Sequence, residues 1–106
     1  MRAKIKNMEK EAWRVFNLSL NRAGQQCPPW ARTSKYRRLF LKIYKRSATK
    51  NAYRFAYGKD GERYQVDHII PLHGKNVSGL HVPWNLKVIP ATVNQCKGTM
   101  IIEEWL

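Results

Sequence analysis

The stretch Val66-Asp67-His68-Ile69-Ile70-Pro71-Leu72 decides the fold. Residues 63–69 have the β-branched and aromatic composition of a strand. Neighbouring side chains on a regular strand point to opposite faces, so Asp67 and His68 can aim at one site only from a bulge or from a strand end. Pro71 just downstream favours such a break. We therefore expect a bulge or a strand end at His68.

A return strand and a short helix follow this stretch. Residues 70–84 are predicted to form a long loop because they contain prolines and glycines. After this loop, residues 85–89 (Asn-Leu-Lys-Val-Ile) have the composition of a second strand. Pro90 suits the first turn of a helix and Gly98 suits its end, which predicts a short helix over residues 91–97.

Two longer helices are predicted in the N-terminal half. Over residues 2–20 the apolar side chains recur at spacings of three and four and therefore share one face: Ile5, Met8, Ala12, Val15 and Phe16. Gly24 interrupts this pattern. A second helix is predicted over residues 34–50, where Thr33 or Ser34 can cap its start. The chain is thus expected to be an α+β protein.

The charge of the chain points to a polyanionic partner. The 106 residues include 20 lysines and arginines against 7 aspartates and glutamates, a formal net charge of +13. Between Arg32 and Arg54 there are nine basic residues and no acid. Four of them recur on one helix face, which we call the basic ridge: Lys35, Arg38, Lys42 and Arg46. Without acids nearby these charges repel one another, and a phosphate backbone would relieve the repulsion. The alternative is a plain solvated face.

Length and composition exclude several other classes of protein. A chain of 106 residues fits one domain, here residues 1–106. It contains no apolar run long enough to span a membrane, and its start lacks the apolar stretch of a signal peptide. Cys27 and Cys96 form neither a disulfide framework nor a CxxC zinc motif. We therefore expect a cytoplasmic protein without membrane contact, and a structural zinc is unlikely.

Three polar residues can form a chemical site if the two strands pair and the short helix packs across them. Asp67 and Asn94 offer oxygen ligands, which suit a hard cation such as Mg²⁺. His68 can accept a proton from water at neutral pH because the usual pKa of histidine is about 6.5. A general base, a metal ion and positively charged side chains around them are the components of metal-assisted phosphodiester hydrolysis. We expect Asp67, His68 and Asn94 to converge.

Three segments together resemble the motif of the HNH endonuclease family, in its variant that ends in asparagine: Asp67-His68-Ile69-Ile70-Pro71-Leu72, Asn85-Leu86 and Asn94-x-x-Lys97-Gly98. Gly79-Leu80-His81-Val82 is similar to the small HNH proteins that bacteriophages often encode. The resemblance covers residues 63–98. It implies a ββα-metal fold over that range, with the basic helical part, residues 1–55, packed on it. For a bacteriophage protein the cytoplasm would be that of the host cell.

The resemblance also implies a role for each matching residue. His68 is the general base that activates the attacking water, and Asp67 and Asn94 bind one Mg²⁺ or Mn²⁺ ion. Asn85 belongs to the catalytic motif, where it pins the loop between the strands through backbone hydrogen bonds. Lys97 is a candidate phosphate contact. The implied activity is hydrolysis of DNA to 5′-phosphate and 3′-hydroxyl ends, and a monomer with one such site would most simply nick.

Several alternatives stay open at this stage. The chain is either an active endonuclease or a basic DNA-binding module on an inactive HNH frame. A third hypothesis is a zinc-stabilised structural module, with ligands from His68, His73, His81 and Cys96. His81 either holds a phosphate or packs the loop. Trp84 is expected in the core or at a seam, or else as a platform on which bases stack.

Overall fold

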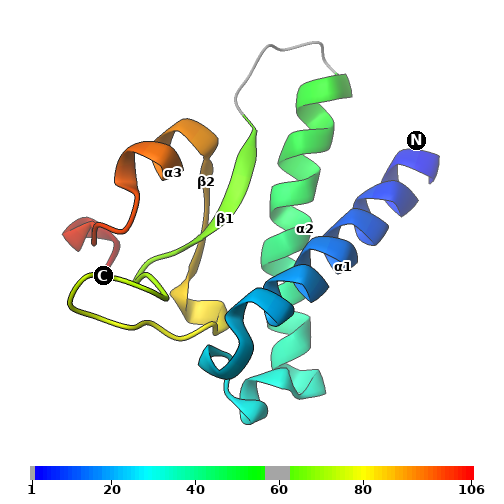
Figure 1. Cartoon of the computed structure of the whole chain (residues 1–106). Coiled ribbons are helices and arrows are strands. Elements are labelled where there is room, and N and C mark those ends of the chain that lie inside the picture. The colour runs from blue at the N-terminus through cyan, green and yellow to red at the C-terminus, as the bar shows by residue number, and fades with distance from the viewer. Residues whose placement is uncertain (1, 57–62) are drawn as a thin grey trace.

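Two long helices precede a two-stranded antiparallel sheet and a short third helix (Figure 1). The computed structural model describes residues 2–56 and 63–106. Its main elements are α1 (Arg2–Ala23), α2 (Ser34–Ala56), β1 (Tyr64–His68), β2 (Leu86–Pro90) and α3 (Ala91–Lys97). The predicted α+β class is therefore confirmed. In the described part of the chain no helix is both long and apolar enough to cross a bilayer.

Each predicted helix is present, and two of them extend beyond the predicted ends. Helix α1 runs on to Ala23, and Gly24, with a φ of 53°, is the residue at which the chain turns away. Helix α2 runs to Ala56 because residues 51–56 contain neither glycine nor proline. Helix α3 has the predicted bounds, and Gly98 after it adopts a φ of 54°. The left-handed backbone region suits glycine, which explains its place there.

The sheet places the two adjacent motif residues on opposite faces. The strands pair in a continuous register that sets Asp67 opposite Lys87 and His68 opposite Leu86. A bulge is therefore not present at this point, whereas the other expected alternative, a strand end at His68, is confirmed. Because the strand is regular up to its end, the Asp67 and His68 side chains point to opposite sides of the sheet.

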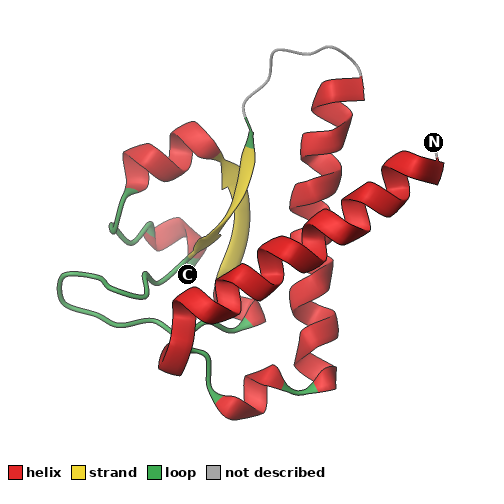
Figure 2. Cartoon of the chain, turned by 45° about the vertical axis from the view of Figure 1, so that its right-hand side comes forward, coloured by secondary structure: helices red, strands yellow, loops and turns green. Residues whose placement is uncertain are grey.

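Helix α2 and helix α3 lie on either side of the sheet, and α1 crosses α2 (Figures 1 and 2). The core forms where α1 and α2 meet the end of the long loop. The Phe16 ring lies 5.1 Å from the Phe40 ring and 5.8 Å from the Tyr44 ring, measured between centroids. Val82 and Leu86 complete this buried cluster. The helices therefore stabilise a sheet that would be marginal alone.

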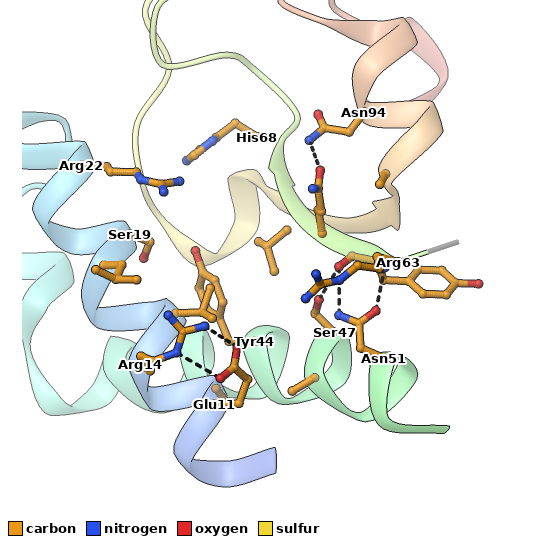
Figure 3. Close-up of a pocket in the computed structure, with 18 of the residues that line it drawn as sticks. Glu11, Arg14, Ser19, Arg22, Tyr44, Ser47, Asn51, Arg63, His68 and Asn94 are labelled. Atoms are coloured by element: carbon orange, nitrogen blue, oxygen red, sulfur yellow. Dashed lines mark hydrogen bonds and ion pairs between the residues drawn. The ribbon is translucent and has the colours of Figure 1, made fainter. Parts of the chain in front are cut away.

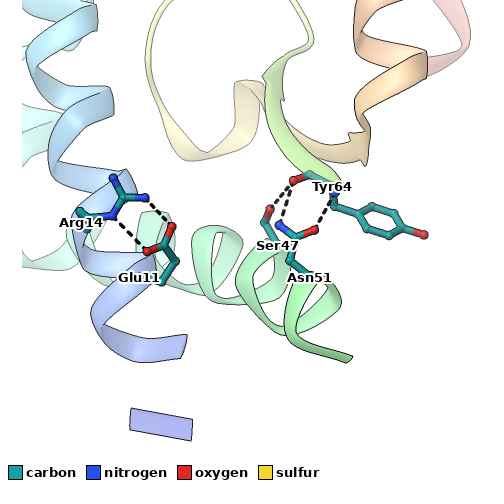
Figure 4. Close-up of polar contacts among 5 residues, drawn as sticks. All are labelled: Glu11, Arg14, Ser47, Asn51 and Tyr64. Carbon is teal, nitrogen blue, oxygen red and sulfur yellow. Dashed lines mark hydrogen bonds and ion pairs between the residues drawn. The ribbon is translucent and has the colours of Figure 1, made fainter. Parts of the chain in front are cut away.

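Side chains from both helical segments fix the strand and the loop. Asn51 of α2 accepts a hydrogen bond from the Tyr64 backbone N–H and donates one to the Tyr64 carbonyl, at 2.7 and 3.1 Å (Figure 4). Gln26, just after α1, donates to the carbonyls of Leu72 and Gly79. These contacts satisfy exposed backbone groups of an edge strand and of a loop, and so hold both against the helices.

Candidate functional site

A cavity of about 600 Å³ lies between α1, α2, β1 and α3 (Figure 3). Its walls carry three arginines, two histidines and one of the motif asparagines: Arg14, Arg22, Arg63, His68, His81 and Asn94. The cavity thus gathers basic and proton-accepting groups from segments far apart in the sequence.

His68 reaches the cavity from the end of β1. Its ring is partly buried, and its Nε2 lies 2.9 Å from Nδ1 of His81. Burial lowers the pKa of His68; the negative charge of Asp67 opposes this shift and the positive charge of Lys97 adds to it. His68 is therefore neutral at pH 7 and keeps a nitrogen lone pair that can accept a proton.

His81 is fully buried behind His68. Its ring stacks on the Phe40 ring with 5.0 Å between centroids, and its Nε2 lies 3.0 Å from Oγ of Ser19. Burial, followed by the charges of His68 and Arg32, lowers the pKa of His81 to about 4. Of the two roles left open for His81, the geometry matches packing of the loop. The side chain is fully buried although it belongs to the cavity wall, and the phosphate contact stays a prediction.

Lys97 is also buried, in an ion pair with Asp67. The ammonium lies 2.9 Å from Oδ2 of Asp67 and donates a hydrogen bond of 3.0 Å to the His68 carbonyl. The Lys97 side chain is 1% exposed and the Asp67 side chain 14%. The Lys97 ammonium is thus paired inside the protein, and its contact with a phosphate stays a prediction. Asp67 Oδ2 has the ion pair but no hydrogen bond.

Asn94 and Asp67 both lie at the seam between β1 and α3. The Asn94 amide donates a 2.7 Å hydrogen bond to Gln65, which lies on the same strand face as Asp67. Asn94 and Lys97 are three residues apart on α3 and share its inner face. The expected convergence is thus divided: Asp67 and Asn94 share the seam, whereas His68 and Asn94 share the cavity. Asp67 does not line the cavity.

The seam offers the kind of ligands that a hard cation takes. The Asp67 carboxylate is there, and the Asn94 amide oxygen stays available because its Nδ2 makes the bond to Gln65. Two protein oxygens leave room for the water ligands that Mg²⁺ retains. Among the described residues no group of three or more His, Cys, Asp and Glu side chains comes together as a metal site. The four residues of the zinc alternative accordingly do not gather.

Asn85 makes the backbone hydrogen bonds that the sequence predicts for it. Its Oδ1 accepts from the Ile70 N–H at 2.8 Å, and its Nδ2 donates to the carbonyls of Ile70 and Leu80, both at 2.9 Å. Gly79 lies against this junction, where a Cβ atom would come within 2.2 Å of the Ile70 carbonyl oxygen. Asn85 and Gly79 together close the loop that follows His68.

Three cations that line the cavity with His68 were not singled out as site residues from the sequence. Arg14 and Arg22 of α1 and Arg63 before β1 line the cavity. Arg14 forms an ion pair with Glu11, whose pKa it lowers (Figure 4). The available signal was a polar stripe beside the apolar face of the first helix, at spacings of three and four: Glu11, Ser19 and Arg22, with Val15 between them.

The basic ridge lies on the opposite side of α2. Its four members are exposed, whereas Phe40, Tyr44 and Ser47 form the buried face of the same helix. At 100° per residue, Arg38 and Lys42 point almost directly away from Phe40. The ridge therefore does not line the cavity.

Trp84 lies on the surface, so of its two expected places the core is wrong, whereas its contacts with Trp30 and Tyr36 match a seam between elements. It is 60% exposed and stacks on Trp30, with 5.8 Å between ring centroids and 11° between the planes. Tyr36 packs edge-on against both rings. The alternative, an aromatic platform for bases, stays a prediction.

In comparisons with known proteins, no protein-family model matches the chain, and no curated protein and no solved structure is similar to it.

Proposed function

We propose that this chain is a metal-dependent DNA endonuclease of the HNH type, with β1, β2 and α3 as its ββα-metal unit. The observation that carries the proposal is His68, a neutral and partly buried imidazole that opens into a cavity lined by three arginines. A proton acceptor surrounded by cations is suited to attack by water on a phosphodiester.

Each group in the cavity has a task in this proposal. His68 takes a proton from the attacking water, and its lowered pKa keeps it unprotonated before that step. Arg22 and Arg63 neutralise negative charge on the scissile phosphate and its neighbours, whereas Arg14 is paired with Glu11. Asn85 holds the loop after His68 and so fixes where β1 ends.

Asp67 and Asn94 are the proposed ligands of the divalent ion. They come from β1 and α3 and lie at the seam between these two elements, which supports the proposal. When bound there, Mg²⁺ or Mn²⁺ would supply Lewis-acid stabilisation of negative charge on the phosphate and the leaving oxygen. The carboxylate of Asp67 also carries a buried oxygen without a hydrogen bond.

The test is cleavage of supercoiled plasmid DNA with Mg²⁺ or with EDTA. We expect nicks that depend on the metal, and we expect His68→Ala to abolish them while leaving DNA affinity nearly unchanged. His73→Ala is the matched control, because His73 is exposed on the loop and does not line the cavity. A large loss of affinity in His68→Ala would instead make His68 a folding or binding residue.

One observation favours a second candidate, an inactive DNA-binding module on the same frame. The Lys97 ammonium lies against Asp67, where it supplies the positive charge that a metal would otherwise bring. Binding of DNA without nicking at any Mg²⁺ or Mn²⁺ concentration would support this module and overturn the endonuclease proposal.

The two sets of basic residues should differ in their effect on the reaction. Replacing Arg22 and Arg63 by Ala should lower kcat/KM because these side chains line the cavity with His68. Charge reversal at Arg38, Lys42 and Arg46 should weaken DNA binding and flatten its salt dependence without changing kcat. Equal salt slopes in the wild type and the reversed variant would remove the ridge from the DNA-binding surface.

A further inference from the structure

Three side chains from distant parts of the sequence form a hydrogen-bonded chain that ends at His68. Ser19 Oγ lies 3.0 Å from Nε2 of His81, and Nδ1 of His81 lies 2.9 Å from Nε2 of His68. The His81 ring is neutral at pH 7, because burial lowers its pKa to about 4. The order of donors and acceptors along this chain therefore decides which nitrogen of His68 carries a proton.

The Ser19 hydroxyl sets the direction of the chain. Its single proton points to the Phe16 carbonyl, 2.5 Å away, and a carbonyl oxygen can only accept. Ser19 Oγ must therefore accept from His81, which places the His81 proton on Nε2. The His81 Nδ1 is then an acceptor, and the hydrogen of the 2.9 Å contact belongs to Nε2 of His68.

We propose that His81 is a positioning residue, which orients the His68 ring and holds its proton on Nε2 so that Nδ1 is left as the proton acceptor. The inference rests on the proposed function, because it assigns His81 a part in the same site. In the described part of the protein His68 Nδ1 makes no hydrogen bond, so its lone pair is available to a water molecule. His81 itself is held by the stack on Phe40 and by Ser19.

The first test measures the hydrogen bond in the wild-type protein by NMR, with ¹⁵N-labelled histidine at pH 8. We expect a scalar coupling across the hydrogen bond between His68 Nε2 and His81 Nδ1. We also expect the connecting proton to be bonded to the His68 nitrogen and protected from exchange with water. A proton bonded to His81 Nδ1, or no coupling at all, would overturn the inference whatever the protein does to DNA.

The second test compares two variants of nearly equal size, His81→Asn and His81→Leu. Both lose the stack on Phe40, but only asparagine places an acceptor oxygen near the position of Nδ1. We expect His81→Leu to lose the protected His68 proton and to lower kcat by about 10-fold or more with little change in KM, as is typical when an orienting partner is removed. His81→Asn should keep most of both.

The outcomes separate this inference from the proposed function. If the wild type cleaves DNA and the two variants cleave equally well, His81 does not position His68 and only the inference falls. If the wild type does not cleave DNA with any divalent metal, the proposed function falls and the catalytic part of the inference falls with it. Should both His81 variants fail to fold, Ser19→Ala takes their place. Ser19→Ala removes the acceptor at the end of the hydrogen-bonded chain. An unchanged exchange rate of the His68 proton in this variant would count against the inference.

Discussion

Replacing Lys97 by Met should destabilise the protein by leaving Asp67 buried without its partner. Methionine has nearly the length and volume of lysine, so the change removes the charge and keeps most of the packing. The Lys97 side chain is 1% exposed, and its ammonium contacts the Asp67 carboxylate at 2.9 Å and the His68 carbonyl at 3.0 Å. Both interactions are lost in the variant, and no water can replace them fully.

The expected loss is about 3 kcal/mol in the free energy of unfolding. Breaking a buried ion pair by removing one partner costs roughly 3–5 kcal/mol. We take the lower end because the Asp67 side chain keeps 14% exposure and can regain some hydration. For a domain of this size the loss corresponds to a fall in Tm of about 15 °C.

Urea denaturation of four proteins tests this number. The matched control is Lys87→Met, because Lys87 lies opposite Asp67 in the sheet but is exposed, and its loss should cost under about 1 kcal/mol. Adding Asp67→Asn to Lys97→Met removes the unpaired charge and should recover more than half of the loss. Equal unfolding midpoints for the wild type and Lys97→Met would refute the argument that this ion pair stabilises the fold.

The same variants connect the ion pair to the proposed metal site. If Asp67 binds the divalent ion, Mg²⁺ should stabilise Lys97→Met more than the wild type, since the competing ammonium is gone. It should not stabilise the variant that also carries Asp67→Asn. Mg²⁺ effects that are the same in all three proteins would remove Asp67 from the metal site.

Two further predictions concern the loop and the buried histidine. Asn85→Ala should lower the free energy of unfolding by about 3 kcal/mol, because three side-chain hydrogen bonds to the backbone of Ile70 and Leu80 are lost. The control is Asn76→Ala on the exposed loop, which should change the free energy of unfolding little in the same urea assay. Stability should fall as the pH drops from about 6.5 to about 4, because the unfolded chain binds a proton there that the folded His81, with its pKa of about 4, does not. This effect of His81 on the free energy of unfolding is roughly 3 kcal/mol and is fully present above pH 6.5. The free energy of unfolding of His81→Asn should therefore change less with pH over this range.

Local signals in the sequence were sufficient to predict the three helices and two strands, but not the ends of α1 and α2. Pro90 and Gly98 bracket α3 because proline fixes a φ that suits a helix start, whereas glycine tolerates the positive φ that ends a helix. The end of α2 was missed because residues 51–56 carry no such signal, while the apolar spacing weakens there. A helix with no stop residue continues until tertiary contacts end it, and the local sequence does not predict those contacts.

The partners of buried polar groups could not be predicted in this way. The resemblance made Lys97 a candidate phosphate contact, and nothing in the sequence indicated that it would neutralise Asp67 inside the fold. His81 pairs with His68 across a loop whose path depends on Asn85 and Gln26. Spacing along the chain limits which residues can meet, but the choice among them depends on desolvation and on contacts made by the whole fold.

The regular end of β1 sets the main geometric condition on the proposed reaction. Asp67 and His68 point to opposite faces of the sheet, so a phosphate in contact with both must lie at the strand edge, where the faces meet. Asn94 is at this edge, because it bonds Gln65 in the seam and also lines the cavity of His68. With only two strands in the sheet, this edge of β1 has no third strand covering it in the described part of the protein. The edge is therefore the one position from which the seam and the cavity can act on the same phosphate.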